Sequence, residues 1–308
     1  MKNIIKEICD ELNIKHTTFS KDWCYLLEKD GVSWIINGYK FPLNDHAAGL
    51  VADDKYALYE LLKLKNVPII EHKIMFRASN KSDYADGNND LAGAIQYLKE
   101  NGVLVIKPNN GTCGNGVARV YTENELVEHI NDLFLENFSI SLCPYYDIKT
   151  EYRTIILDGK IECMYGKERP IIYGDGIKTV KELLIDFNPS YFNNESHFFN
   201  KKIDLNYVPK KAEKVEYNWQ HNLAKGSQVI TEIPLETQEK IKEVALKAYE
   251  ASNLKFCSVD VIETNDEFLV MEINSGVTIK RYINLIPNGY DVAKQIYKNA
   301  IMKLFNIN

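Results

Sequence analysis

Residues 256–274, FCSVDVIETNDEFLVMEIN, constrain the fold of this chain more than any other segment, because they have the pattern of two apolar strands joined by a polar turn. Glu272 and Asn274 are two residues apart, so on a strand their side chains share a face. A hairpin that turns about Asp266 places Asp260 opposite Glu272 on that face. Two carboxylates and an amide oxygen on one surface suit a hard cation such as Mg²⁺, with Mn²⁺ also possible. The alternative is an edge hairpin with a solvated polar face.

The length and charge of the chain limit what it can be. With 308 residues it can bury a substantial core and form two or three subdomains. A formal net charge of −6, with no long basic run, argues against a nucleic-acid partner. The start of the chain lacks the apolar core of a signal peptide, and no stretch approaches the roughly 18 apolar residues that span a bilayer. We therefore expect a cytoplasmic protein with no membrane partner.

A second informative pattern lies at residues 103–117, VLVIKPNNGTCGNGV. An apolar strand carries Lys107 to its end, and Gly111, Gly114 and Gly116 follow. Glycines let backbone N–H groups approach phosphate oxygens, and the lysine supplies positive charge. The spacing is not that of a Walker loop, and a strand follows where a dinucleotide fingerprint would open a helix. The pattern predicts a hairpin whose glycine flap covers a nucleotide; a plain glycine turn is the alternative.

Turn and capping patterns along the rest of the chain predict an α+β fold. Asp-Gly pairs at residues 30–31 and 158–159 predict hairpins. Thr-x-x-Glu patterns at residues 122–125 and 179–182 predict the starts of two helices, and Gly102 predicts the end of a helix near residues 91–100.

These elements group into a short N-terminal α/β segment, residues 1–50, and two α+β subdomains, residues 51–145 and 146–308. The predicted glycine flap belongs to the first subdomain and the predicted metal site to the second. Residues 188–228 are rich in Asn, Tyr and Phe and only weakly periodic. This pattern favours a substrate-facing insertion or an ordinary surface excursion about equally.

Several segments in a fixed order resemble the ATP-grasp superfamily: KPNNGTCGNGV, CPYYDIKTEYR, and VDVIE followed by VMEIN. YGDGIKTVKELL and HNLAKGSQVITEI are similar to segments of the cyanophycin synthetases and of the fused glutamate–cysteine ligase/glutathione synthetases within it. The resemblance covers about residues 50–285. It implies the ATP-grasp fold, in which two α+β subdomains clamp ATP, and it is much less specific for the substrate.

The resemblance also implies a role for each matching residue. The ATP-binding residues that it implies are Lys55, Lys107, Gly111, Thr112, Gly114, Asn115, Gly116, Cys143, Tyr145 and Glu151. The two lysines contact phosphates, the flap covers the β- and γ-phosphates, Cys143 to Tyr145 form the hinge beside adenine, and Glu151 binds the ribose hydroxyls. The implied Mg²⁺ ligands are Asp260, Glu272 and Asn274.

Catalytic roles are implied for Lys107, Arg153 and Arg281. Arg153 shares the face of Glu151 on its strand and could reach the acceptor carboxylate or the transferring phosphoryl group. Arg281 follows the metal strand, where the family holds the substrate. A structural or solvated arginine is the alternative for each. Because this chain has Cys-Ser where many ligases of the fold place an arginine, we expect charge stabilisation from Arg153 or Arg169.

Together these implications predict an ADP-forming, ATP-dependent carboxylate–amine ligase. It would form an amide or peptide bond through an acylphosphate, with amino acids or short peptides as substrates. Two alternatives remain open. One is a ligase that modifies a peptide or protein docked on residues 188–228, and the other is a nucleotide-binding regulatory module without ligase activity. A homodimer would be common for this fold.

Overall fold

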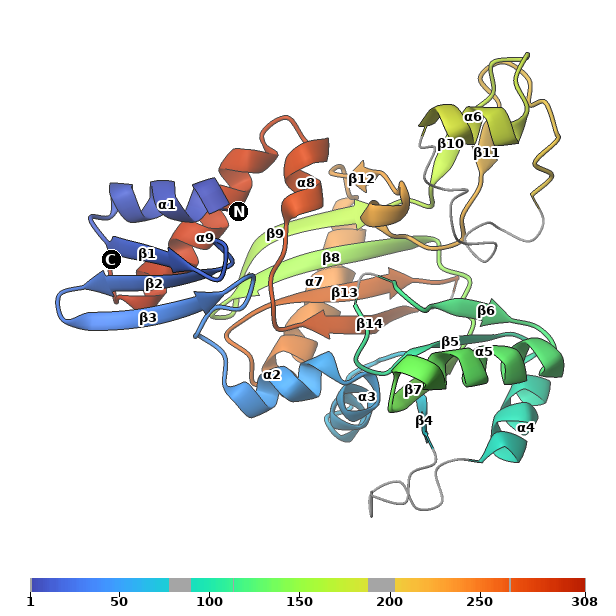
Figure 1. Ribbon diagram of the computed structural model, residues 1–308, viewed down its shortest axis with the longest axis horizontal. Coiled ribbons are helices and arrows are strands. Elements are labelled where there is room, and N and C mark those ends of the chain that lie inside the picture. The colour runs from blue at the N-terminus through green and yellow to red at the C-terminus, as the bar shows by residue number, and fades with distance from the viewer. Residues whose placement is uncertain (1, 78–89, 113, 188–202, 266, 308) are drawn as a thin grey trace.

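The computed structural model describes residues 2–77, 90–112, 114–187, 203–265 and 267–307, and within them the strands form four separate β-sheets. Figure 1 shows the sheets one after another along the molecule, with the N-terminal sheet at one end. The predicted α+β class is confirmed, because helices cover faces of antiparallel sheets throughout. The division into the three segments 1–50, 51–145 and 146–308 remains a prediction.

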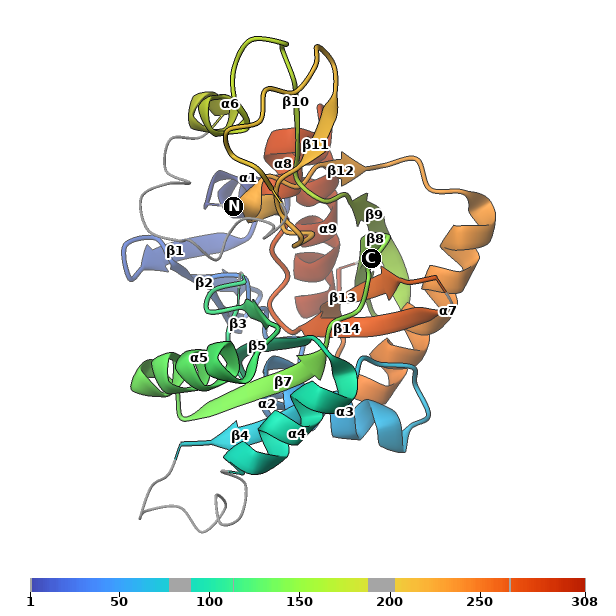
Figure 2. The same ribbon diagram turned by 90° about the vertical axis from the view of Figure 1, so that its right-hand side faces the viewer.

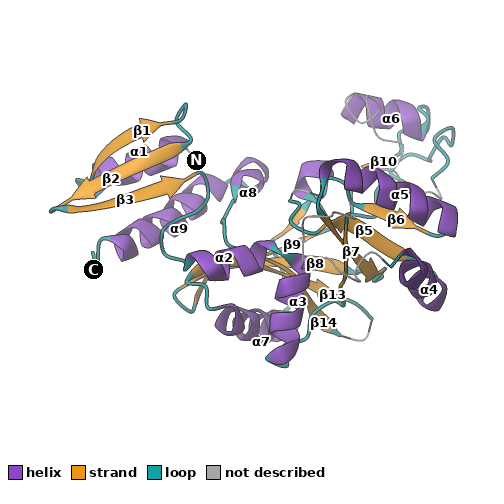
Figure 3. Cartoon of the chain, turned by 60° about the horizontal axis from the view of Figure 1, so that its bottom comes forward, coloured by secondary structure: helices purple, strands orange, loops and turns teal. Residues whose placement is uncertain are grey.

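The N-terminal sheet is a three-stranded meander, β1-β2-β3, backed by helices from both ends of the chain. The Asp30-Gly31 hairpin between the second and third strands is confirmed, and both residues have positive φ, as such a turn requires. Helices α1 and α9 lie side by side (Figures 1 and 3) and share a core with the sheet. The elements are α1 Lys2–Glu11, β1 Lys15–Phe19, β2 Cys24–Lys29, β3 Val32–Asn37 and α9 Gly289–Leu304.

A four-stranded antiparallel sheet, in the order β4-β7-β5-β6, carries the glycine-rich segment between β5 and β6. Helices α4 and α5 pack together beside it. The predicted stop at Gly102 is confirmed by its φ of 72°, and Thr122 caps α5 by accepting a hydrogen bond from the Glu125 amide. The elements are β4 Lys73–Phe76, α4 Leu91–Asn101, β5 Leu104–Pro108, β6 Ala118–Val120, α5 Glu123–Glu136 and β7 Ser139–Pro144.

The central sheet has five strands in the order β12-β9-β8-β13-β14. One face is covered by α7, which lies beside α3 (Figure 3). The elements are α2 His46–Asp53, α3 Lys55–Leu64, β8 Thr150–Leu157, β9 Lys160–Lys167, β12 Val229–Ile230, α7 Leu235–Ser252, β13 Phe256–Glu263, β14 Phe268–Asn274 and α8 Lys280–Leu285.

The face of the central sheet opposite α7 is apolar at both ends and polar between them. Ile155 and Phe256 belong to the apolar core shared with α9, whereas Ile262, further along β13, belongs to an apolar cluster with the four-stranded sheet. Between these two clusters the alternation of the strands places Arg153 and Asp260 on the same face. A polar patch is thus enclosed between two apolar regions.

A small two-stranded sheet, β10 Ile171–Tyr173 with β11 Lys214–Glu216, projects from the central sheet together with α6 Val180–Phe187 (Figures 1 and 2). Thr179 and Glu182 form the predicted capping box at the start of that helix. Of the predicted insertion, residues 188–202 lie outside the described residues. No helix in the described part of the chain is long and apolar enough to cross a membrane.

Candidate ATP and metal site

The hairpin of β13 and β14 brings Asp260 opposite Glu272, as the sequence predicts. The ladder is not regular, however, because Glu263 pairs with Phe268 and Val261 with Val270 before the register shifts at Asp260. An unbroken ladder from this turn would have placed Met271 opposite Asp260. A β-bulge restores the predicted pair by adding one residue to β14. Asp266, at the predicted turn, lies outside the described residues.

Asp260 is held in a buried ion-pair network with residues from two neighbouring strands. Arg153, directly across on β8, donates two hydrogen bonds to its carboxylate, from Nε at 2.8 Å and from a terminal nitrogen at 2.6 Å. Lys167 on β9 lies 3.3 Å from the same carboxylate and also pairs with Glu151. Two cations and two carboxylates therefore alternate across three strands, and the bidentate geometry fixes the position of Arg153.

The network gives its two carboxylates different pKa values. Burial by itself would raise the pKa of Asp260, but Arg153 and Lys167 outweigh it and lower that pKa to about 2. Burial raises the pKa of Glu151 to about 7, and the charge of Asp260 adds to the rise, against the opposing effect of Lys167. The network therefore favours the charged form of Asp260, and burial disfavours that of Glu151.

Glu272 and Asn274, the other two predicted metal ligands, take no part in this ion-pair network. No hydrogen bond or ion pair to the Glu272 carboxylate is found among the described residues, and the buried Nδ2 of Asn274 also lacks a partner. The Glu272 carboxylate and the Asn274 Oδ1 are hard oxygen ligands of the kind that Mg²⁺ takes, whereas the unpartnered Nδ2 suits an acceptor such as a phosphate oxygen. Asp260 fits less directly, because both of its oxygens already contact cations. The described residues contain no cluster of three or more His, Cys, Asp and Glu side chains suited to a metal.

The two predicted phosphate lysines lie on different elements and are both buried. Lys55 begins α3, and its ammonium donates to the carbonyl oxygens of Asn109, at 3.3 Å, and Gly111, at 2.7 Å. Burial lowers the pKa of Lys55, while the nearby charge of Glu272 raises it and that of Lys107 lowers it. The charges of Glu272 and Lys107 thus both act on the Lys55 ammonium.

The glycine-rich segment forms the loop between β5 and β6 that the sequence predicts. Gly114 and Gly116 have φ of 71° and 65°, which a residue with a side chain rarely adopts. A Cβ at Gly114 would lie 2.8 Å from the amide of Asn222, so the loop touches the end of the predicted insertion. Thr112 and Asn115 are joined by a backbone hydrogen bond of 3.3 Å within the loop. Cys113 lies outside the described residues.

An apolar cluster links the two larger sheets at the predicted adenine position. Cys143 at the end of β7 lies in it with Val105 of β5, and from the other sheet it receives Met271. Tyr145, whose amide donates to the Val103 carbonyl at 3.1 Å, begins the connection between the sheets. Its ring meets that of Trp219 edge to face, with centroids 6.0 Å apart. Apolar and aromatic side chains of this kind suit the faces of a purine base.

Arg281, predicted to be catalytic, and Arg169, considered for charge stabilisation, do not contact the carboxylates of Asp260 or Glu272. Arg281 is exposed on α8, and no contact joins its guanidinium to Asp260 or Glu272 in the described parts of the chain. Arg169 instead pairs with Asp147 at 2.6 Å and with Glu216 at 3.5 Å. Arg153 is therefore the arginine next to the predicted metal site.

Lys167 lies at the centre of this ion-pair network, although no sequence pattern indicated a role for it. The Asp158-Gly159 turn pairs Leu157 with Lys160, and an unbroken ladder would place Gly166 opposite Glu151. A bulge between Ile155 and Ile156 shifts the register by one, so that Lys167 faces Glu151. A bulge leaves little trace in the residue pattern, so no sequence signal was available.

His72 is a second buried residue that the sequence did not indicate. Its Nδ1 lies 2.6 Å from the Ser141 hydroxyl, and burial together with Lys107 and Lys55 lowers its pKa well below the ordinary value. The folded protein therefore keeps His72 neutral, while the unfolded chain binds a proton below about pH 6.5.

We expect the free energy of unfolding to fall as the pH drops below about 6.5, and His72→Gln to weaken that fall. Urea denaturation at pH 7.5 and pH 5.5 measures both values. His16→Gln, at a partly exposed position on β1, serves as the control and should leave the pH dependence unchanged. Equal acid sensitivity in wild type and His72→Gln would contradict the expectation.

Comparisons with known proteins agree with this fold. Residues 208–300 match the RimK-like ATP-grasp domain. The bifunctional glutathione synthetase from Pasteurella multocida superposes with a TM-score of 0.55 at 15% identity, covering 96% of this chain and 44% of that one. The D-alanine–D-alanine ligase from Bacillus anthracis gives 0.55 at 16% identity, covering 86% and 72%. The chain therefore has the fold of the ATP-grasp ligases, as its motifs indicate.

Similarity to curated proteins extends beyond the matched domain. The glutathione biosynthesis bifunctional protein GshAB of Listeria welshimeri is 22% identical over 269 residues, which are 77% of this chain and 34% of that protein. The α-aminoadipate–LysW ligase LysX of Saccharolobus solfataricus is 23% identical over 273 residues, which are 87% and 77%. The chain thus spans about a third of the length of its GshAB relatives.

Proposed function

We propose that this protein is an ATP-dependent carboxylate–amine ligase that forms an amide or peptide bond and releases ADP. Its substrates would be amino acids or short peptides. The observation that carries the proposal is the β13–β14 hairpin, whose Glu272 carboxylate acts electrostatically on the buried Lys55, the lysine that contacts the glycine-rich loop at Gly111. The ligases among its relatives and structural neighbours support the same reading.

Activation of a carboxylate is the chemical problem that such a site addresses, because oxide is a poor leaving group. The substrate carboxylate attacks the γ-phosphorus of ATP in line, which breaks the bond to ADP and forms an acylphosphate. An amine then attacks the acyl carbon and inorganic phosphate leaves, so no protein nucleophile is required. The protein contributes positioning and electrostatic stabilisation.

Each group of residues would perform one part of that task. Lys55 and Lys107 would hold the phosphates, and Arg153 would offset charge next to Asp260. The glycine loop would close over the phosphates and exclude water, which would otherwise hydrolyse the acylphosphate. Mg²⁺, held by Glu272 and Asn274 with Asp260 as a further ligand, would neutralise charge on the β- and γ-phosphates. Glu151 and the cluster at Tyr145 would hold the ribose and adenine.

Measuring ADP release with a panel of amino-acid pairs, in the presence of ATP and Mg²⁺, tests the proposal. We expect at least one pair to stimulate ADP release, and Lys107→Met to lower the stimulated rate by about 100-fold or more. Lys242→Met, on the exposed face of α7, is the matched control and should not change it. Normal ATP binding without stimulation by any pair or short peptide would instead favour a regulatory nucleotide-binding module.

A further inference from the structure

The end of β14, where the predicted metal ligand Asn274 lies, needs support from outside its sheet. β14 is the edge strand of the central sheet, and Asn274 is its last residue, paired with Ser258 on one side. Along the open edge of β14, the described residues form backbone hydrogen bonds only at Val270. A residue at the end of an edge strand has few ladder bonds to hold it, so its position depends on other contacts.

Such contacts come from residues 39–53, the linking segment, which leads from the N-terminal sheet through α2 to α3. Val277, just beyond the strand, donates its amide hydrogen to the carbonyl of Tyr39 at 3.1 Å. The side-chain amide of Asn44 donates to the carbonyls of Phe256, at 2.7 Å, and Ser275, at 3.1 Å. Figure 1 shows α2, the last part of the linking segment, next to the end of β14. The backbone on both sides of the hairpin end is therefore bound to one segment.

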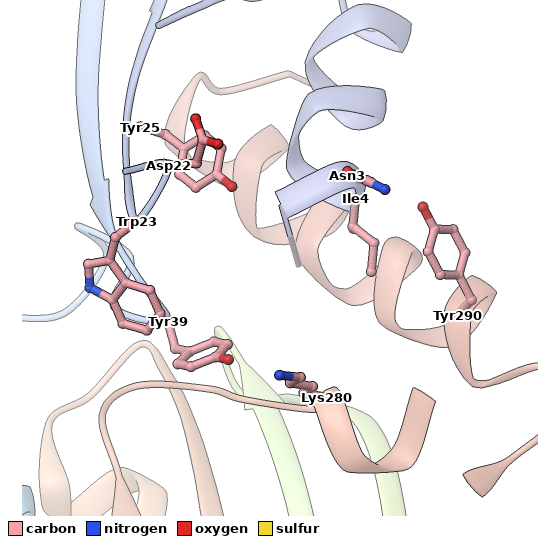
Figure 4. Close-up of a pocket in the computed structure, with 8 residues that line it drawn as sticks. All are labelled: Asn3, Ile4, Asp22, Trp23, Tyr25, Tyr39, Lys280 and Tyr290. Atoms are coloured by element: carbon pink, nitrogen blue, oxygen red, sulfur yellow. The ribbon is translucent and has the colours of Figure 1, made fainter. Parts of the chain in front are cut away.

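The start of the linking segment is anchored to the N-terminal sheet. The ring of Tyr39 meets that of Trp23 edge to face, with centroids 5.5 Å apart. Figure 4 shows the Tyr39 ring between Trp23 and Lys280, all three of which line one cavity. Gly276 lies close to this anchor, because a Cβ there would be 3.3 Å from Cγ of Lys40. The chain that leaves the metal strand thus passes directly against a fixed part of the linking segment.

Asp53, the last residue of α2, binds the residue next to Asn274. One oxygen of its carboxylate accepts a hydrogen bond from the Ser275 hydroxyl at 3.1 Å, and Ser275 is 4% exposed. The other oxygen pairs with the Lys40 ammonium at 2.5 Å, in a more exposed position. The Ser275 hydroxyl also lies against α2, since a Cβ at Gly49 would be 3.6 Å from its oxygen. A charged acceptor therefore holds a buried hydroxyl at the end of the metal strand.

Asp53 is linked to the predicted phosphate lysine by the chain itself. Asp54 caps α3 by accepting a hydrogen bond from the Ala57 amide at 2.8 Å, and Lys55 is the first residue of that helix. Burial lowers the pKa of Lys55, whereas the charges of Glu272, Asp54 and Asp53 raise it. One residue thus separates the carboxylate that binds the metal strand from the lysine that contacts the glycine-rich loop.

We propose that Asp53 is a positioning residue for the ATP and metal site, although it need not touch ATP or the metal. Its carboxylate fixes the end of the metal strand relative to the start of α3, and so fixes Asn274 relative to Lys55. The inference rests on the proposed function, which assigns Asn274 to Mg²⁺ and Lys55 to the phosphates. Misplacing binding groups by about 1 Å can cost about 100-fold in rate, so a single hydrogen bond at this position can have a large effect.

Isothermal titration calorimetry of the full chain, with Mg²⁺ and the β,γ-imido analogue of ATP, tests the inference without turnover. We expect Asp53→Ala to weaken binding of the analogue by about tenfold or more. Asp53→Asn should stay within about threefold of the wild type, because its amide oxygen can still accept from Ser275. Asp186→Ala, which removes a similar surface pair with Lys178 at 2.5 Å, is the matched control and should not change the affinity.

Ser275→Ala removes the same hydrogen bond from the other side. It should also weaken binding of the ATP analogue by about tenfold, because the end of the metal strand is then released in the same way. The double variant Asp53→Ala with Ser275→Ala should bind no more weakly than the weaker of the two single variants, since both changes remove one bond. Effects that multiply in the double variant would show that the two residues act independently, and would overturn the inference.

The Mg²⁺ requirement separates a positioning role from a merely structural one. In Asp53→Ala, more Mg²⁺ should be needed to reach half-maximal binding of the ATP analogue, because Asn274 is displaced. Asp53→Asn should restore the wild-type requirement, because it keeps the hydrogen bond to Ser275. A merely structural role would instead lower the midpoint of urea denaturation in Asp53→Ala, with an unchanged affinity and an unchanged Mg²⁺ requirement in the folded protein.

Wild-type affinity in both Asp53→Ala and Ser275→Ala would overturn the inference. Equal losses in Asp53→Ala and Asp53→Asn would overturn it as well, since the charge and not the hydrogen bond would then be responsible. Absence of nucleotide binding by the wild type would overturn the proposed function together with the positioning role. Nucleotide binding that depends on Asp53, without ADP release in the presence of any amino-acid pair or short peptide, would support the positioning role and overturn the ligase proposal alone.

Discussion

Arg153→Met should lower the free energy of unfolding by about 3–5 kcal/mol, one of the two largest effects that we expect in this protein. The side chain of Asp260 is 1% exposed, and Arg153 supplies both of its short hydrogen bonds. Without the arginine, a buried carboxylate would depend on Lys167, which it already shares with Glu151. Removing one partner of a buried pair is costly because the other charge stays away from water.

Urea denaturation at pH 7.5 measures this effect, and a double mutant identifies its cause. Arg153→Met combined with Asp260→Asn should recover part of the lost stability, because the unpaired charge is then gone. Arg77→Met is the matched control, since Arg77 is exposed and its guanidinium donates to the Phe134 carbonyl at 3.1 Å, with no carboxylate partner among the residues that the structure describes. A loss below about 1 kcal/mol for Arg153→Met would mean that the pair contributes no more than a surface ion pair.

Unlike Arg153→Met, which should mainly lower stability, Glu272→Gln should cause a large loss of activity and little loss of stability. The Glu272 carboxylate has no ion-pair or hydrogen-bond partner in the described residues, so its neutralisation should change the free energy of unfolding by no more than about 0.5 kcal/mol. If Glu272 holds Mg²⁺, the rate of ADP release should fall by about 100-fold or more.

Rates of ADP release measured across a range of Mg²⁺ concentrations test this expectation. The variant should require more Mg²⁺ than the wild type, which distinguishes a metal ligand from a residue that only contacts substrate. Glu243→Gln, exposed on α7 and paired with Lys247 at 2.7 Å, is the control. A wild-type rate and an unchanged Mg²⁺ requirement in Glu272→Gln would remove Glu272 from the metal site.

The sequence predicted most accurately the turns, helix ends and helix caps, because each depends on only a few neighbouring residues. The hairpin turn at residues 30–31 and the helix stop at Gly102 both depend on backbone conformations that few residues adopt. The helix caps at Thr122 and Thr179 depend on side chains next to the amides that they satisfy. Each of these inferences needed only a few consecutive residues.

Elements with weaker local patterns were missed. Strand β1, with its sequence KHTTF, alternates between exposed and partly exposed residues and so lacks an apolar face that could indicate a strand. Helix α8 has six residues, too few for a hydrophobic period to be recognised. Both owe their conformation to neighbours far away in the chain.

The sequence by itself determined which chemical groups this protein carries on which strands, because strand alternation and turn chemistry act over a few residues. It therefore predicted the pair of Asp260 and Glu272. Only the tertiary structure decided which cations meet those carboxylates. Two bulges shift the register by one residue each, and a shift of one residue exchanges the two faces of a strand, so the placement of Lys167 against Glu151 and Asp260 depends on how whole strands pack.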